Sequence, residues 1–137
     1  MAAAIPEQYT DLLQKKAFAH LGTVMSDGSP QVTPVWFDYD GTHVRINSAK
    51  GRWKDKNMRN RPKVALEILD PDNPYRYMQI RGKVVEITED GADAHIDSLA
   101  KKYLGQDKIQ IPDEQNMQIV INPHGNTLGP VSVFLEK

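Results

Sequence analysis

A cluster of basic residues between positions 47 and 63 is the part of this sequence best suited to binding a ligand. The segment holds seven lysines and arginines and one acid, Asp55, so it carries +6 in a chain whose formal net charge is −1 and whose other residues sum to −7. A compact positive segment on an acidic body is typical of a site for one particular anion, whereas a protein that binds polyanions along its whole surface is basic throughout. A solvated cationic helix face is the alternative interpretation.

The beginning of this cluster has the residue types of a phosphate site. Ser48 ends an expected strand just before an expected helix, where free backbone N–H groups and the helix dipole favour an anion. Arg52 and Lys54 can add charge-assisted hydrogen bonds, and Trp53 supplies a flat apolar surface. No glycine-rich P-loop or dinucleotide-binding motif occurs, so neither of those sites is indicated. The cations at the far end of the cluster are interpreted as solvated charge: Arg59, Arg61 and Lys63.

No constellation of side chains in the sequence forms an obvious catalyst. The chain has no cysteine, which excludes thiolate nucleophiles, zinc–thiolate sites and disulfides. Its four histidines are widely spaced and form no metal-ligand motif, so no metal is expected. No serine lies in the Gly-x-Ser-x-Gly elbow of a hydrolase. An enzyme built in this way would take its reactive atom from a cofactor.

The elements that must position these residues are mostly strands. With 137 residues, the chain is expected to form a single domain, residues 1–137. Alternating apolar residues and turn signals predict strands over 19–25, 30–39, 42–48, 63–69, 75–87, 117–122 and 131–135, with an irregular turn over 123–130. Apolar periodicity predicts helices over 5–17, the basic segment up to Pro62, and 92–104 with Gly105 as its stop. This order predicts a mainly β fold, a small antiparallel barrel with short helical caps.

A further observation concerns the location of the protein. The N-terminal residues have neither the basic start nor the long apolar run of a signal peptide, and no apolar run approaches the roughly 20 residues of a membrane span, so a cytoplasmic protein with no membrane partner is expected.

The strand over 30–39 contains two prolines. Pro30 and Pro34 lack backbone N–H donors, so their strand is expected at a sheet edge or facing a ligand.

The order of segments resembles the pyridoxamine-phosphate-oxidase-like family of split β-barrels, and specifically its deazaflavin (coenzyme F420)-dependent reductase branch. The resemblance covers roughly residues 12–121. It is carried by LGT at 21–23, GSPQVTPVW at 28–36, NSAKGRWKDKN at 47–57, LDPDNPYRY at 69–77 and RGKVVEI at 81–87. It implies an FMN-binding-like split β-barrel that forms a homodimer, with two cofactor sites at the subunit interface.

The resemblance also implies roles for particular residues. The deazaflavin ring edge would be lined by Gln31, Val32, Thr33 and Pro34. The ring and ribityl chain would be bordered by Asn47, Ser48 and Ala49. The phosphate would be held by Arg52, Lys54 and Asn57, the oligoglutamate tail by cations such as Lys50 and Lys56, and the site would be completed from the partner subunit by Tyr75 and Tyr77. The implied activity is hydride transfer from reduced F420 to an unsaturated small-molecule substrate, with no proton donor identified.

Three other functions fit the same residues. FMN also has a phosphate but lacks the oligoglutamate tail, so the same fold could serve an FMN-binding oxidoreductase. The basic helix could belong to a module that binds nucleic acid, although the net charge of −1 and the lack of an aromatic stacking motif count against it. A protein that carries or sequesters a cofactor without turning over a substrate is the third.

Overall fold

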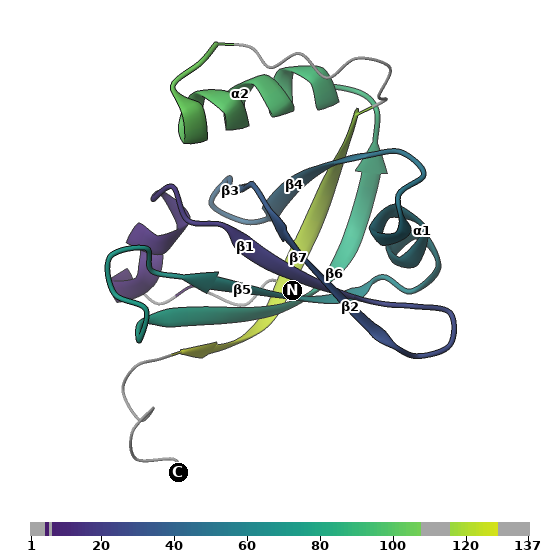
Figure 1. Cartoon of the computed structure of the whole chain (residues 1–137), viewed down its shortest axis with the longest axis horizontal. Coiled ribbons are helices and arrows are strands. Elements are labelled where there is room, and N and C mark those ends of the chain that lie inside the picture. Colours follow the sequence, from purple (N-terminus) through teal and green to yellow (C-terminus); the bar gives the residue numbers. More distant parts are fainter. Residues whose placement is uncertain (1–4, 6, 108–115, 129–137) are drawn as a thin grey trace.

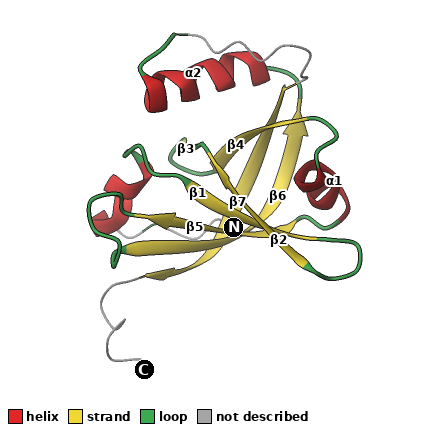
Figure 2. Cartoon of the chain, viewed as in Figure 1, coloured by secondary structure: helices red, strands yellow, loops and turns green. Residues whose placement is uncertain are grey.

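The computed structural model describes residues 5, 7–107 and 116–128 of the chain, which form one curved antiparallel sheet with three short helices around it (Figures 1 and 2). The strands are β1 (Ala19–Val24), β2 (Pro30–Val35), β3 (Phe37–Tyr39), β4 (Val44–Ala49), β5 (Lys63–Leu69), β6 (Tyr77–Thr88) and β7 (Asn116–Leu128). The helices are the 3-10 helix η1 (Glu7–Leu13), α1 (Trp53–Asn60) and α2 (Ala92–Leu104). The predicted mainly β, antiparallel split β-barrel is confirmed.

The strand order explains how the barrel closes. Within the described chain the strands are arranged β2-β1-β5-β6-β7-β4-β3, so β2 and β3 lie at opposite edges of the sheet. These two edge strands are nevertheless neighbours in the sequence and are separated by Trp36 alone. β2 pairs with β1, whereas β3 pairs with β4. The chain therefore crosses from one edge of the sheet to the other at Trp36, and the single strand predicted over 30–39 is in fact two.

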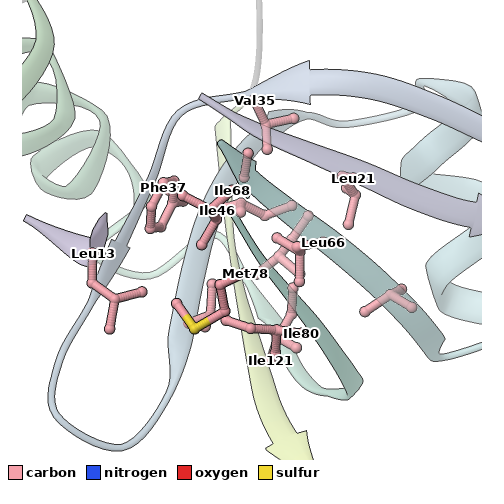
Figure 3. Packing of buried hydrophobic residues seen from close by; sticks show 14 of the residues in the cluster. Leu13, Leu21, Val35, Phe37, Ile46, Leu66, Ile68, Met78, Ile80 and Ile121 are labelled. Atoms are coloured by element: carbon pink, nitrogen blue, oxygen red, sulfur yellow. The ribbon is translucent and has the colours of Figure 1, made fainter. Parts of the chain in front are cut away.

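Side chains alternate between the core and the outside along most strands. In β1, Ala19, Leu21 and Thr23 are buried while their neighbours are partly exposed, as the two-residue period of a strand requires. Leu21, Phe37, Leu66 and Ile80 meet inside the curved sheet (Figure 3). Other members of this core are Leu12, Leu13, Val35, Val44, Ile46, Ile68, Met78, Ile119 and Ile121. The inward-facing side chains of this core come from strands that are far apart in the sequence.

Two predicted elements differ from the structure. The helix predicted over 5–17 is a seven-residue 3-10 helix that buries Tyr9, Leu12 and Leu13. The prediction of an irregular turn over 123–130 is wrong as far as Leu128, because β7 continues through Pro123 and pairs with β6 up to that residue. A register shift there pairs Gly82 with Pro123 and Arg81 with Gly125, which leaves a bulge that accommodates the proline. The strand predicted over 131–135 lies outside the described residues.

The helix ends follow the sequence signals. α1 ends at Asn60, two residues before Pro62, as predicted. α2 ends before Gly105, whose left-handed φ of 71° closes the last turn through hydrogen bonds from its N–H to the carbonyls of Ala100 and Lys101. In Figure 1, α1 and α2 lie on different sides of the barrel, and the chain that precedes α1 leaves the end of β4.

Candidate functional site

The loop before α1 is held in place by a buried acid. Gly51 has a left-handed φ of 89°, and its N–H donates to Asp55 Oδ2 (2.8 Å). Arg59 Nε donates to the other oxygen of the same carboxylate (2.7 Å), and Asp55 is only 3% exposed. Since both carboxylate oxygens are engaged, the loop and the first turn of the helix are fixed together. This arrangement presents Arg52 and Lys54 from the beginning of α1.

These two cations line a cleft of about 270 Å³. The cleft is bounded by residues from five segments: Phe18, Pro34, Val35, Trp36, Asn47, Arg52, Lys54 and Ile96. Burial lowers the pKa of Lys54, and the neighbouring positive charge of Arg52 lowers it further. Two like charges at one cleft repel each other, and a bound anion would relieve that repulsion. Of the fourteen residues predicted to contact a cofactor, the structure brings four to this cleft, namely Pro34, Asn47, Arg52 and Lys54.

Another wall of the cleft is aromatic. Trp36 stacks on Tyr103 with ring centroids 5.1 Å apart and planes within 4°, and Phe18 stacks on the same tyrosine at 5.8 Å. The Tyr103 hydroxyl donates to the carbonyl of Ala17 (2.6 Å) and accepts from the N–H of Phe37 (3.3 Å). Burial of this phenol raises its pKa to about 12, so the hydroxyl stays a donor at neutral pH. The tyrosine is therefore a rigid support for both outer rings.

Sequence reasoning did not assign a role to this wall. Phe18, Trp36 and Tyr103 are far apart in the chain, and only the crossing at Trp36 brings β2 and β3 beside α2. The single signal in the sequence was the apolar stripe of α2, which includes Ile96 and Tyr103. That stripe reveals that the helix packs against the barrel, but it does not reveal which aromatic residues it meets.

Asn47 is held at the cleft by contacts from α2 and β3. Its Nδ2 donates to the carbonyl of Ala92 (2.9 Å) and lies 3.3 Å from His95 Nδ1. The other ring nitrogen of His95 lies 3.2 Å from Asp38 Oδ2, and Arg45 binds the Asp38 carboxylate through two nitrogens at 2.8 and 2.9 Å. Burial alone would raise the pKa of Asp38, but His95 and Arg45 outweigh it and lower that pKa. His95 is thus a buried packing histidine.

Gln31 and Asn57 form a separate buried network. Asn57 is 1% exposed, so it does not line the cleft. Its Nδ2 donates to Thr23 Oγ1 (3.0 Å) and Gln31 Oε1 (3.3 Å), and its Oδ1 accepts from Arg61 Nη2 (3.2 Å). Arg61 Nε also donates to the carbonyl of Val24 (2.6 Å). The interpretation of Arg61 as solvated charge is therefore wrong.

Arg59 was also interpreted as solvated charge, and it too has partners inside the protein. Its Nε binds Asp55, and its Nη2 lies 2.9 Å from Met117 Sδ. Lys63, at the start of β5, is exposed as expected. The far half of the basic cluster consequently contributes to folding more than to ligand binding, because two of its three cations are tied to buried or half-buried groups.

The remaining predicted residues lie apart from the cleft. Ser48 and Ala49 are buried at the end of β4, and Thr33 is half-buried in β2. Lys50 pairs with Glu89 (3.2 Å), and Lys56 lies over the Trp53 ring at 4.9 Å. Val32 is 63% exposed and belongs to a groove on the sheet face with Gly22, Ala65 and Gln79.

Tyr75 and Tyr77 lie near the turn between β5 and β6. β5 begins directly after α1 and ends at this turn, so its seven residues, at roughly 3.3 Å each, separate the tyrosines from α1 by about 20 Å. Figure 1 shows α1 and the β5–β6 turn at opposite ends of the barrel. Tyr75 is 54% exposed and Tyr77 is half-buried. Neither tyrosine is among the residues that line the cleft of this chain.

The described part of the chain holds neither a cluster of metal ligands nor a membrane-spanning helix. Among residues 5, 7–107 and 116–128, no group of three or more histidine, aspartate or glutamate side chains could hold a metal ion. None of the helices in the same ranges is long and apolar enough to cross a membrane.

One solved structure with this architecture is described as an F420 reductase. It has 36% sequence identity with the chain, a TM-score of 0.81, and coverage of 90% of this chain and 98% of its own. The sequence profile of pyridoxamine 5'-phosphate oxidase matches residues 5–124. The chain belongs to the pyridoxamine 5'-phosphate oxidase family. Within that family, it is similar to the F420-reductase branch.

Two solved structures with lower sequence identity share the fold alone. The conserved hypothetical protein Rv2991 from Mycobacterium tuberculosis has 18% identity and a TM-score of 0.74, with coverage of 93% of this chain and 85% of its own. General stress protein 26 from Bacillus anthracis has 18% identity and a TM-score of 0.67, with coverage of 89% and 91%. No curated protein matches the chain significantly.

Proposed function

We propose that this protein is an F420-dependent oxidoreductase that transfers a hydride from the reduced deazaflavin to an unsaturated small molecule. Membership of the pyridoxamine 5'-phosphate oxidase family and similarity to an F420 reductase support an oxidoreductase with a flavin or deazaflavin cofactor. The observation that carries the finer proposal is the cleft at which Arg52 and Lys54 converge with Asn47 and Pro34, in a chain 36% identical to that reductase.

The residues of the cleft fit a ligand with an anionic end and a planar ring. Arg52 and Lys54 would bind the phosphate, because their mutual repulsion and the burial of Lys54 both favour a bound anion. Asn47, which α2 holds in a fixed orientation, would border the ribityl chain, and β2 from Gln31 to Pro34 would line the ring. When bound, the cofactor would supply the hydride from its ring carbon.

The aromatic wall would exclude water from this site. Trp36 and Phe18 are supported by Tyr103, whose hydroxyl is fixed by backbone groups of Ala17 and Phe37. A rigid wall of this kind holds a substrate in a defined orientation at little entropic cost, which is the protein's share of the catalysis in this proposal.

We also propose that two copies of the chain form the complete site. The tyrosines at 75 and 77 lie about 20 Å from α1 in their own chain, as the length of β5 requires. The exposed sheet face around Val32, Gly22 and Ala65 is grooved and partly apolar, which suits a subunit contact. Light scattering of the purified protein tests this proposal, and a monomer with full cofactor affinity would contradict it.

Cofactor titration tests the proposed function. Purified protein is titrated with F420 and with FMN while its tryptophan fluorescence is followed. F420 is expected to bind more tightly, because the cations near α1 can also meet its oligoglutamate tail, and tighter binding of FMN would favour the FMN-dependent alternative. Turnover of reduced F420 with a panel of unsaturated acceptors then separates an enzyme from a carrier.

Variants of the two cations locate the phosphate. Arg52→Ala and Lys54→Ala are each expected to weaken F420 by about 1–3 kcal/mol, the scale of a lost charge-assisted hydrogen bond, which is roughly 5- to 150-fold in Kd. Lys101→Ala is the matched control, because Lys101 is an exposed cation of α2 paired with Asp107 (3.4 Å). Equal affinity of all three variants and the wild type would remove the phosphate assignment.

A further inference from the structure

The aromatic wall of the cleft keeps part of its ring surface exposed. Phe18 is 51% exposed and Trp36 is half-buried, and both side chains line the cleft. Single apolar side chains on a protein surface are ordinary, but these two rings stack on the same residue, Tyr103, at a cleft that also holds two cations. A rigid apolar surface beside a charged group is suited to the apolar part of a ligand.

The shape of this wall favours a flat ligand. The ring plane of Tyr103 lies within 4° of that of Trp36 and within 23° of that of Phe18, so the three rings are nearly parallel. Tyr103 holds them in place, because its hydroxyl donates to the carbonyl of Ala17 (2.6 Å) and accepts from the N–H of Phe37 (3.3 Å). A flat conjugated ring can stack on such a surface over its whole face, whereas a ring with tetrahedral carbons contacts it only through a few hydrogens.

The other groups of the cleft determine the charge that this ligand can carry. Among the described residues that line the cleft, only Arg52 and Lys54 are charged, and in the proposed function both bind the cofactor phosphate. The other six are Asn47 and five apolar side chains: Phe18, Pro34, Val35, Trp36 and Ile96. An anionic ligand at the wall would lose its hydration without gaining a free cation, and a cationic one would lie beside two like charges. The wall therefore suits an uncharged ligand.

We propose that the substrate reduced at this cleft is a flat, uncharged conjugated ring compound, and that Phe18 and Trp36 are the residues that select it. This inference rests on the proposed function, which supplies the reduced cofactor. A quinone represents the class. It becomes the hydroquinone by gaining a hydride, which carries two electrons and one proton, from the reduced deazaflavin, and one proton from solvent. Oxidised deazaflavin remains after it has also released one proton to solvent.

Phe18→Leu tests the selection for a flat ring, because it keeps an apolar side chain and removes the ring face. The protein is assayed with reduced F420 and either 1,4-naphthoquinone, which is flat, or 2-cyclohexen-1-one, whose ring contains tetrahedral carbons. We expect kcat/KM for the naphthoquinone to fall about 3- to 10-fold through a higher KM, the scale of one aromatic stacking contact, and kcat/KM for the cyclohexenone to change less than about 2-fold. Equal losses for the two acceptors, or no loss for either, would overturn the inference.

Two further variants complete this comparison. Phe18→Tyr keeps the flat ring and should retain the wild-type preference. Val85→Ala is the matched control for a loss of exposed apolar surface, because Val85 is 53% exposed and does not line the cleft. If Phe18→Leu does not fold, Phe18→Met replaces it, since it also removes the ring and keeps an apolar side chain.

Binding measurements separate the substrate from the cofactor. The Kd of 1,4-naphthoquinone for the complex with oxidised F420, measured by calorimetry, should rise in Phe18→Leu by the same factor as KM, while the Kd of F420 itself stays within about 2-fold. A matching loss of F420 affinity would show that the wall holds the cofactor, and would overturn the inference. The flat anion 1,4-naphthoquinone-2-sulfonate should have a KM at least about 5-fold higher than that of the neutral quinone, and an equal or lower KM would overturn the requirement for an uncharged substrate.

The outcomes for the two proposals are distinct. If the wild type does not bind F420, or binds it and reduces no acceptor, the proposed function fails and the inference fails with it. If the wild type reduces both acceptors and Phe18→Leu affects them equally, only the substrate class is overturned. Arg52→Ala in the same assays reports on the phosphate end of the site, and it should weaken F420 without changing the preference between the two acceptors.

Discussion

The turn that presents Tyr75 depends on one buried carboxylate, and we predict that removing its charge destabilises the protein in a pH-dependent manner. Asp70 is 4% exposed. It accepts from Arg76 Nη1 (2.9 Å), Lys15 Nζ (3.0 Å) and the N–H of Asp72 (2.9 Å). Arg76 extends this network to η1 through two hydrogen bonds to Asp11. Asp70→Asn keeps the shape of the side chain and removes the charge.

The size of this destabilisation follows from the pKa of the Asp70 carboxyl. Burial would raise the pKa of Asp70, but the N–H of Asp72 and the cations of Lys15 and Arg76 outweigh burial and lower it from 3.8 to about 2. A shift of this size corresponds to about 2 kcal/mol of stability, and screening at the partly exposed cations reduces it to roughly 1–2 kcal/mol. Because the folded-state pKa is the lower one, this stability is present above about pH 4 and is lost as the pH falls toward 2.

Urea denaturation of the wild type and Asp70→Asn measures the effect. We expect the free energy of unfolding to differ by roughly 1–2 kcal/mol at pH 7 and to converge as the pH approaches 2. Asp72→Asn is the matched control, because the side chain of Asp72 contacts the same lysine but is 78% exposed, so its loss should cost less than about 0.5 kcal/mol. A difference that does not change with pH, or an equal cost in the control, would refute this reasoning.

Two further predictions concern α2 and the β6–β7 pair. Burial lowers the pKa of Lys102 to about 8, although the charge of Asp38 partly opposes this shift. NMR of the reductively methylated protein should therefore show one lysine side-chain amine titrating near pH 8, a signal that Lys102→Arg removes while the α-amine signal stays. The unfolded chain binds this proton more tightly, so the charged lysine destabilises the folded state below about pH 8, and this penalty is relieved as the pH rises from 8 toward 10.5. A titration midpoint near 10.5 would contradict the burial. Gly82→Ala should cost about 2–4 kcal/mol in thermal or urea unfolding, because a Cβ there would lie 2.7 Å from Ile121 Cγ2 within a paired strand. Gly22→Ala, whose Cβ would meet its nearest neighbour at 3.5 Å, should cost under about 1 kcal/mol, and similar losses in both variants would rule out the steric explanation.

Local patterns in the sequence were sufficient for most of the elements. The alternation in 19–25 and 63–69, the Pro62 boundary and the Gly105 cap each depend on a few neighbouring residues, and the structure has them where these signals predict. The separation of β2 from β3 could not be predicted in this way. It arises because the two halves of one extended segment pair with different strands, and pairing partners are not recorded in local periodicity.

The candidate site was predictable in part for the same reason. Arg52 and Lys54 are neighbours at a helix start, so their convergence follows from local geometry. The roles of Asn57 and Arg61 do not follow from local geometry. A charged or amide side chain on a short helix is expected to be exposed unless the strands that cover it are known. Here Thr23 and Val24 of β1 supply the partners, more than thirty residues earlier in the chain.

The two edges of the sheet have a consequence for how this protein meets other molecules. β2 carries prolines at both ends of its exposed row, Pro30 and Pro34, and β3 is only three residues long. An unpaired edge that lacks N–H donors, or one that is very short, is a poor template for the addition of another strand, so both edges protect the chain against aggregation through sheet extension. A second copy of the chain would therefore be expected to associate through side chains, such as the exposed Val32 on the sheet face, and not through strand addition at either edge.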